Sequence, residues 1–181
     1  MMSSAVESQS HPIRRKQLTF GQGYSPGIIG QIVTLHAKTY SDWADFGSAF
    51  ETKVATELSQ FTSRLDHTGN ALWHVSSDDQ ILGSIAIDGE DLGGGRAHLR
   101  WFIVAPVARG IGLGRQLLDE ALAFVDDQGF QATQLWTLKG LENARSLYER
   151  TGFKLKSEYE GDQWGTRIVE QTFIREQPPR G

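Results

Sequence analysis

Residues 104–115 read VAPVARGIGLGR, the end of an apolar strand that runs through three alternating glycines into an amphipathic helix. Gly110, Gly112 and Gly114 have no Cβ atoms, so the main chain can approach a bulky anion there. It can also present successive N–H groups at the positive end of the helix. The segment therefore predicts a pyrophosphate site, although a tight turn without a ligand is an alternative explanation of the glycines.

Two arginines flank these glycines and strengthen the prediction of a phosphate site. Arg109 and Arg115 can add charge-assisted hydrogen bonds to phosphate oxygens. Two familiar phosphate motifs are nevertheless excluded. A P-loop requires Gly-Lys followed by Ser or Thr, whereas this chain has Gly114-Arg115-Gln116. A dinucleotide-binding fingerprint requires a third glycine at the position of Arg115.

Hydrophobic periodicity on both sides of this segment predicts an α/β domain. We expect strands at residues 13–20, 71–75, 81–87, 97–104, 134–138, 153–159 and 166–174, and helices that begin at Ser25-Pro26 and cover residues 50–61, 113–125 and 141–150. The order β-α-α-β-β-β-α-β-α-β-β is typical of a mixed sheet with helices packed on its faces.

Length and composition set further limits. The 181 residues suit one domain, which we expect over residues 12–175, with disordered polar tails at 1–11 and 176–181. The absence of cysteine excludes disulfides, thiolate metal sites and a cysteine nucleophile. The net charge of −4 argues against nucleic-acid binding. No apolar run is long enough for a membrane span or a signal peptide, so we expect a cytoplasmic protein.

Two motifs together resemble the GNAT N-acetyltransferase superfamily. Arg109-x-x-Gly112-x-Gly114, between a strand and a helix, resembles the acetyl-CoA pyrophosphate loop of that family. The segment Ala144-Arg-Ser-Leu-Tyr-Glu-Arg-Thr-Gly-Phe153 is similar to the family's Ala-x-x-Leu-Tyr-x-x-x-Gly-Phe segment. The order of elements also matches, so the resemblance covers residues 12–175. It implies the GNAT fold, with a mixed, mostly antiparallel sheet.

A narrower resemblance links the chain to bacterial proteins that fuse a MarR-type helix-turn-helix regulator to a GNAT domain. It rests on His36-Ala-x-x-Tyr40, Phe50-Glu51, Leu99-Arg-Trp-Phe, Leu135-Trp-Thr137 and Leu147-Tyr-Glu. About a dozen residues precede the first expected strand, too few for the regulator. We therefore expect a freestanding acetyltransferase module.

The family resemblance also implies how acetyl-CoA binds. The main chain of Ile103 and Val104 would contact the pantetheine arm. The pyrophosphate would lie on the amides of Arg109, Gly110, Ile111, Gly112, Leu113 and Gly114, with Arg115 close by. Tyr148 matches the tyrosine that protonates the departing thiolate, and a phenol with a pKa of about 10 can do so at neutral pH. The alternative role for Tyr148 is simple packing of the last helix on the sheet.

The expected strand at residues 97–104 contains no Asp or Glu that could act as the general base. His98 and Arg100 lie two apart and so share one face of the expected strand. His98 is a candidate base, or an ordinary partly exposed histidine. Arg100 could bind a substrate carboxylate or phosphate, or form an ion pair with a residue such as Glu51.

Other residues are candidates for acceptor binding. Glu51 is one of them, and Glu51, Glu90 and Asp91 are also the next carboxylates to test for the missing base. Trp43 lies in a polar segment between the first two helices and could line the acceptor site, although core packing is an alternative. The histidines show no metal-ligand spacing with carboxylates, so we predict no metal.

These observations predict an acetyl-CoA-dependent N-acetyltransferase that acts directly on the amine of a small molecule, either an amino acid or a similar amine. One alternative is a protein acetyltransferase acting on lysine or amino-terminal amines. Another is a non-catalytic acyl-CoA sensor. We expect no nucleic-acid or membrane partner, and a homodimer is compatible with the family.

Overall fold

The computed structural model describes residues 18–177. The tail expected at residues 1–11 lies outside this part, as do residues 178–181 of the expected carboxyl-terminal tail. The last strand ends at Glu176, one residue beyond the domain end that we expected at Arg175.

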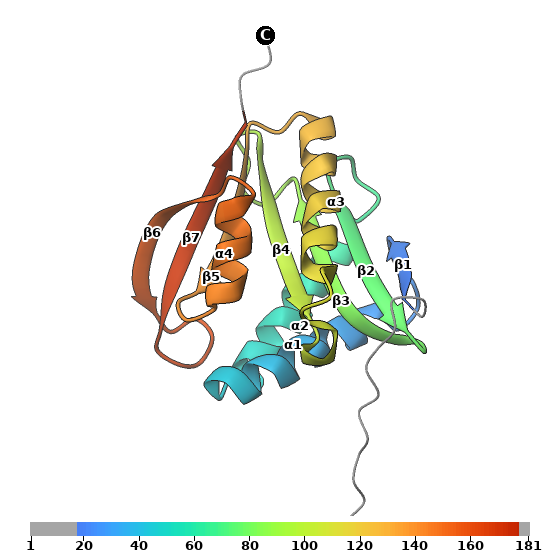
Figure 1. Cartoon of the computed structure of the whole chain (residues 1–181), viewed down its shortest axis with the longest axis vertical. Helices are drawn as coiled ribbons and strands as arrows, with labels where there is room; N and C mark the ends of the chain where they lie inside the picture. Colours follow the sequence, from blue (N-terminus) through green and yellow to red (C-terminus); the bar gives the residue numbers. More distant parts are fainter. Residues whose placement is uncertain (1–17, 178–181) are drawn as a thin grey trace, which may run out of the picture.

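The described chain forms one seven-stranded sheet in the order β1-β2-β3-β4-β5-β7-β6 (Figure 1). The strands are β1 (Thr19–Gln22), β2 (Ala71–Ser77), β3 (Gln80–Asp88), β4 (Arg96–Val104), β5 (Ala132–Leu138), β6 (Lys154–Gly161) and β7 (Ile168–Glu176). All neighbouring strands are antiparallel except β4 and β5, which are parallel. The expected mixed, mostly antiparallel sheet is confirmed.

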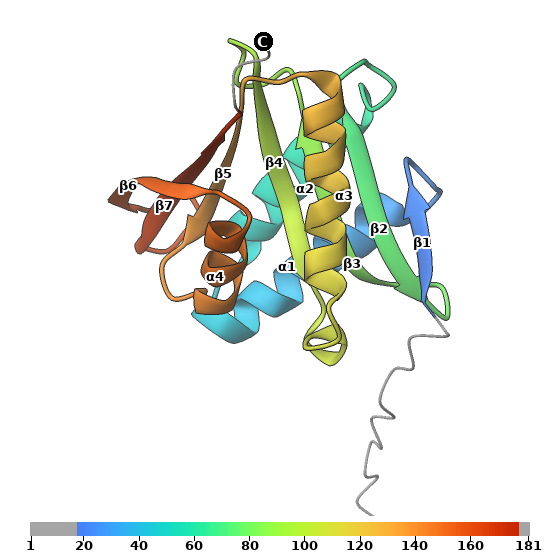
Figure 2. The same ribbon diagram turned by 45° about the horizontal axis from the view of Figure 1, so that its top comes forward.

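Helices cover both faces of the sheet (Figure 2). They are α1 (Ile28–Ala44), α2 (Ser48–Thr62), α3 (Leu113–Gln128) and α4 (Glu142–Arg150), with a single helical turn, η2 (Pro106–Ala108), before α3. One hydrophobic cluster joins α1 and α2 to the sheet, and a second joins α3 and α4 to its other face. None of the helices in the described part is long and apolar enough to cross a membrane.

Hydrophobic periodicity identifies the buried face of α2 correctly. In α2, Phe50, Val54, Leu58 and Phe61 are all buried, as their spacing of four, four and three residues requires. Helix α3 ends at Gly129, whose φ of 79° places it in the left-handed region that terminates helices.

The amino-terminal elements differ from expectation. Helix α1 is preceded by Gly27, which has a φ of 90°, and Ser25 is not its N-cap. Strand β1 also continues through Gly21 to Gln22, beyond the strand end that we expected at residue 20. A Cβ at Gly21 would lie 2.4 Å from Cε1 of His74, so glycine allows the two neighbouring strands to accommodate this imidazole ring.

The five tryptophans divide into three groups by burial. Trp73 and Trp101 are buried, Trp136 and Trp164 are partly buried, and Trp43 is 39% exposed. The two partly buried rings line a cavity of about 610 Å³.

Candidate active site

Strands β4 and β5 diverge to open a gap in the middle of the sheet. Residues 96–98 of β4 pair with residues 132–134 of β5, and no later residues of the two strands pair. Each strand continues, β4 to Val104 and β5 to Leu138. The carboxyl-terminal halves of these parallel strands therefore have no strand partner in the gap between them (Figure 1).

A bulge in β4 lies beside this gap. Trp101 has a φ of 45°, unusual for a residue with a side chain, and the β3–β4 register shifts between Ser84 and Ala86. The Ser84 hydroxyl donates a 2.8 Å hydrogen bond to the Trp101 carbonyl oxygen and so satisfies that buried group. Bulges bend the strand that contains them, which is consistent with β4 turning away from β5.

A cavity of about 610 Å³ extends from the gap beneath α1 and α2. Its lining residues include Tyr40, Lys53, Glu57, Arg64, Asp91, His98, Arg100, Phe102, Trp136, Tyr148, Tyr159, Gln163, Trp164 and Glu170. The cavity therefore connects the end of the gap, at Phe102 and Tyr148, with a strongly polar region around His98 and Arg100.

The glycine-rich turn follows the open end of β4. Gly110 and Gly112 have φ values of 79° and 84°, where a side chain would be strained. Gly112 immediately precedes α3 and no side chain caps this helix. Because the first N–H groups of a helix have no acceptor within it, the start of α3 can bind an anion.

Other residues of the turn are arranged consistently with the predicted acetyl-CoA site. A Cβ at Gly114 would lie 3.5 Å or more from its neighbours, so packing within the described chain does not require glycine there. No residue of β5 pairs with Ile103 or Val104. The Arg109 Nε donates to the Val104 carbonyl oxygen at 3.2 Å, and Arg115 forms an exposed ion pair with Asp119 at 2.7 Å.

Tyr148 projects from α4 into the cavity. Its ring packs against Phe102, Phe153 and Phe173, with ring centroids 5.9–6.1 Å apart. Burial and the nearby Tyr40 phenol raise the pKa of Tyr148 above its ordinary value, so the hydroxyl keeps its proton at neutral pH. No described residue forms a hydrogen bond with this hydroxyl.

His98 lies at the other end of the cavity, between a carboxylate and an aromatic ring. Its Nδ1 is 2.6 Å from Oδ2 of Asp91, and its ring meets Trp136 edge-on at 4.4 Å. Burial lowers the His98 pKa, and Arg100 lowers it further, although Asp91 and Asp88 act in the opposite direction. The imidazole is therefore neutral at pH 7, and a proton shared with Asp91 on Nδ1 leaves Nε2 as the basic nitrogen.

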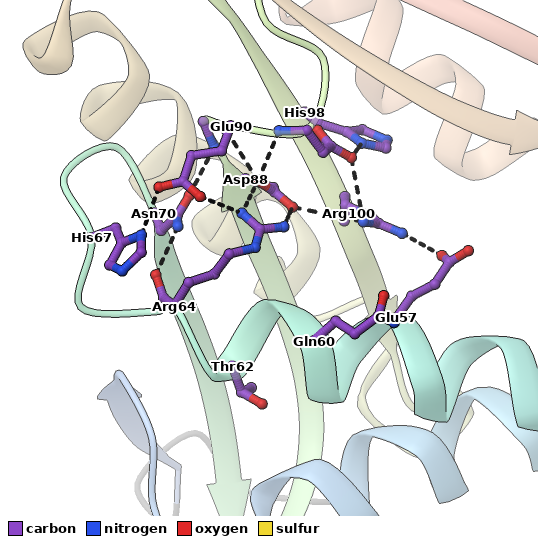
Figure 3. Close-up of polar contacts among 12 residues, drawn as sticks. Glu57, Gln60, Thr62, Arg64, His67, Asn70, Asp88, Glu90, His98 and Arg100 are labelled. Carbon is purple, nitrogen blue, oxygen red and sulfur yellow. Dashed lines mark hydrogen bonds and ion pairs between the residues drawn. The ribbon is translucent and has the colours of Figure 1, made fainter.

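An ionic network lies beside His98 (Figure 3). Arg64 binds both oxygens of the buried Asp88 at 2.5 and 2.7 Å, and binds Glu90 at 3.0 Å. Arg100 pairs with Glu57 and lies 3.7 Å from Asp88. Burial alone would raise the Asp88 pKa, but hydrogen bonds from Arg64 and the Glu90 amide hold it below its ordinary value.

Two residues predicted to bind the acceptor lie outside the cavity. Glu51 is exposed on α2, and Trp43 packs beside Gly140 and Tyr40. The predicted ion pair between Arg100 and Glu51 is wrong, because Glu57 is the partner. The other predicted residues at the acceptor end, His98 and Arg100, do line the cavity together with Asp91.

A polar stripe on α2 and just beyond it lines the cavity and was not predicted from the sequence. Lys53, Glu57, Gln60 and Arg64 all line the cavity. Their spacing of four, three and four residues places them on one helical face, beside the apolar face that was predicted. This periodicity was visible in the sequence. No group of three or more His, Asp or Glu side chains within residues 18–177 could hold a metal ion.

Comparison with known families and structures agrees with this geometry. The model of the "Acetyltransferase (GNAT) family" matches residues 35–153, more than half of the chain. The matched residues include the glycine-rich turn, both strands that border the gap, and Tyr148. No curated protein matches the chain.

Solved structures share the fold at low sequence identity. An acetyltransferase from Streptococcus agalactiae superposes with a TM-score of 0.69 at 20% identity, covering 90% of this chain and 99% of that one. An acetyltransferase of the GNAT family from Staphylococcus aureus gives 0.69 at 15% identity, covering 88% and 98%. A ribosomal-protein-alanine N-acetyltransferase from Brucella melitensis gives 0.69 at 14%, covering 88% and 99%.

Proposed function

Because the chain belongs to the acetyltransferase (GNAT) family, we propose that it transfers the acetyl group of acetyl-CoA directly to the amine of a small molecule. The observation that carries this proposal is the single cavity that joins the β4–β5 gap to the polar region around His98. The chain has no cysteine, so no protein thiol can carry the acetyl group.

The glycine-rich turn and the end of β4 would hold acetyl-CoA. The main chain of Ile103 and Val104 lies along the gap, and the uncapped start of α3 suits the pyrophosphate. Arg109 and Arg115 lie close enough in sequence to add positive charge. The bound molecule supplies an acetyl group activated as a thioester.

Tyr148 would act as the general acid. Its hydroxyl is protonated at neutral pH, lines the cavity and has no competing hydrogen-bond partner in the described chain. It can therefore donate a proton to the sulfur as negative charge develops there.

His98 would act as the general base. An amine must lose its proton before it attacks, and a neutral imidazole whose Nδ1 is held by Asp91 can accept that proton at Nε2. Arg100, which is held by Glu57 and Asp91, would help to orient the acceptor.

A small-molecule acceptor fits the site better than a protein. The polar groups lie inside a cavity that α2 and the β6–β7 hairpin border, and a 610 Å³ volume is within the range of small-ligand pockets, about 300–1,000 Å³. A peptide would have to reach the same groups through an extended side chain.

A screen of amines tests this proposal. Acetyl-CoA is incubated with amino acids, simple amines and lysine-containing peptides, thiol release is measured, and products are identified by mass spectrometry. We expect acetylation of one or more small amines. Preference for peptides would support the protein-acetyltransferase alternative, and acetyl-CoA binding without any transfer would support the sensor alternative.

A further inference from the structure

Two buried polar atoms without partners belong to residues that line the same cavity. The first is Oε1 of Glu170 on β7, and the second is Nε1 of Trp164 in the β6–β7 turn. Neither atom has a hydrogen-bond partner in the described chain, and Glu170 as a whole is only 1% exposed. Buried polar atoms are usually paired, because an unpaired one costs about 1–3 kcal/mol.

Glu170 differs from the other carboxylates that line the cavity. Glu57 pairs with Lys53 and Arg100, and Asp91 pairs with His98 and Arg100. Glu170 forms no ion pair with any described residue. Its other oxygen, Oε2, accepts hydrogen bonds from the neutral Tyr159 hydroxyl and the neutral Gln163 amide.

Neutral donors can orient a carboxylate, but they do not compensate its charge. A buried carboxylate is stable when a cation lies beside it. The surroundings also suit a cation, because aromatic faces attract ammonium groups. The Lys53 ammonium already lies 5.4 Å from the centre of the Trp164 ring, and the tilted Phe50 ring lies 5.5 Å from it.

Gly161 on the neighbouring strand β6 leaves space for the Glu170 carboxylate. A Cβ there would lie 2.2 Å from Oε1 of Glu170, so any other residue would displace the carboxylate. Gly161 does not have the positive φ that would itself require glycine. The Glu170 carboxylate can therefore occupy its position only because residue 161 is glycine.

We propose that Glu170 and Trp164 form the acceptor-binding site, and that the acceptor is a small amine with an oxygen near its ammonium group. The carboxylate of Glu170 binds the ammonium form in which amines exist at neutral pH. The indole N–H of Trp164 donates to the acceptor's hydroxyl, carbonyl or carboxylate oxygen. The inference rests on the proposed function and assigns these residues to binding, with Tyr148 and His98 handling the protons.

Kinetics with matched substrates test the two contacts separately. Ethanolamine, n-propylamine and a panel of amino acids are used as acceptors at saturating acetyl-CoA. Glu170→Gln keeps the shape but removes the charge, so KM for every accepted amine should rise about 10- to 100-fold. Trp164→Phe keeps a ring but removes the N–H, so it should abolish the preference for oxygen-bearing amines over n-propylamine.

Three controls separate binding from folding. Glu160→Gln changes an exposed carboxylate on β6 and should leave KM unchanged. Gly161→Ala retains the Glu170 carboxylate but moves it, and should raise KM as Glu170→Gln does. Acetyl-CoA affinity, measured by calorimetry, should equal that of the unmodified protein in each variant and so report an intact fold.

The outcomes distinguish the inference from the proposed function. If the unmodified protein acetylates no amine, both are overturned. If it acetylates amines and Glu170→Gln leaves KM unchanged, the inference alone is wrong. It is equally wrong if Trp164→Phe retains the full preference for ethanolamine over n-propylamine.

Discussion

At the scale of single residues, the proposed proton donor is one hydroxyl in an apolar setting. Tyr148 is surrounded by three phenylalanine rings, and this burial keeps its proton in place. The same packing would exist if the tyrosine were purely structural. Only removal of the oxygen atom separates the two roles.

Tyr148→Phe is therefore the first test. We expect kcat to fall about 100-fold, the lower range for loss of a general acid, with little change in the dissociation constant for acetyl-CoA. Stopped-flow thiol detection and calorimetry measure the two quantities. Tyr24→Phe, at an exposed position outside the cavity, is the control. An unchanged kcat for Tyr148→Phe would remove the acid role.

The pH dependence reports on His98. Burial lowers its pKa, so the acid limb of kcat/KM should lie below pH 6.5, the ordinary value for histidine. Asp91 raises the His98 pKa, so Asp91→Asn should move the acid limb to still lower pH and should also lower the rate. A limb that stays in place in the variant would show that another group is the base.

Sequence alone identified some of these residues and missed others. His98 and Arg100 could be predicted because alternation in a strand places them on one face. Glu170 could not, because its significance depends on Gly161 and Gln163, which the hairpin brings to it. An isolated glutamate in a strand gives no sign that its partner is missing.

At the scale of elements, the start of α3 is the predicted binding site of the acetyl-CoA pyrophosphate. The turn before it has left-handed backbone at Gly110 and Gly112, which glycine adopts without strain. The gap beside it was not predicted from the sequence. It depends on a bulge at Trp101, and no turn-forming residue in the sequence marks that bulge.

Two glycine variants at opposite ends of α3 separate cofactor binding from stability. Gly112 and Gly129 have φ values of 84° and 79°, so alanine at either position should destabilise the fold by about 1 kcal/mol. Only Gly112→Ala should also raise the dissociation constant for acetyl-CoA. Thermal unfolding and calorimetry measure both effects. Equal affinities in the two variants would argue against the predicted pyrophosphate site.

At the scale of the whole molecule, the ionic network ties the end of α2 to the central strands. Arg64 lies just beyond α2, and its partner Asp88 ends β3 with a side chain that is 0% exposed. The apolar core on this face was predictable from helical periodicity. The network was not, because its members lie up to 43 residues apart in sequence.

Arg64→Gln tests how much this network stabilises the fold. Loss of the guanidinium leaves Asp88 without its closest partner and should lower the free energy of unfolding by about 2–3 kcal/mol. This is less than the loss expected for a fully buried ion pair, because the Arg64 side chain is 24% exposed. Because the folded-state pKa of Asp88 is lowered, this stability is present above the unfolded pKa of about 3.9 and is lost as the pH falls through the folded value.

The corresponding measurement is chemical unfolding between pH 3 and pH 7. The difference between the unmodified protein and Arg64→Gln should shrink as the pH falls below about 4. Arg145→Gln, which removes an exposed ion pair with Glu149, should leave the unfolding midpoint almost unchanged. A difference that does not depend on pH would assign the role of Arg64 to packing instead of charge.

The central claim is that this cavity acetylates a small amine. The most direct measurement is mass spectrometry of the products after incubation with acetyl-CoA and a mixed panel of amino acids and amines. We expect an N-acetylated small amine whose formation is greatly slowed by Tyr148→Phe. Tight acetyl-CoA binding with no acetylated small amine in the panel would contradict it.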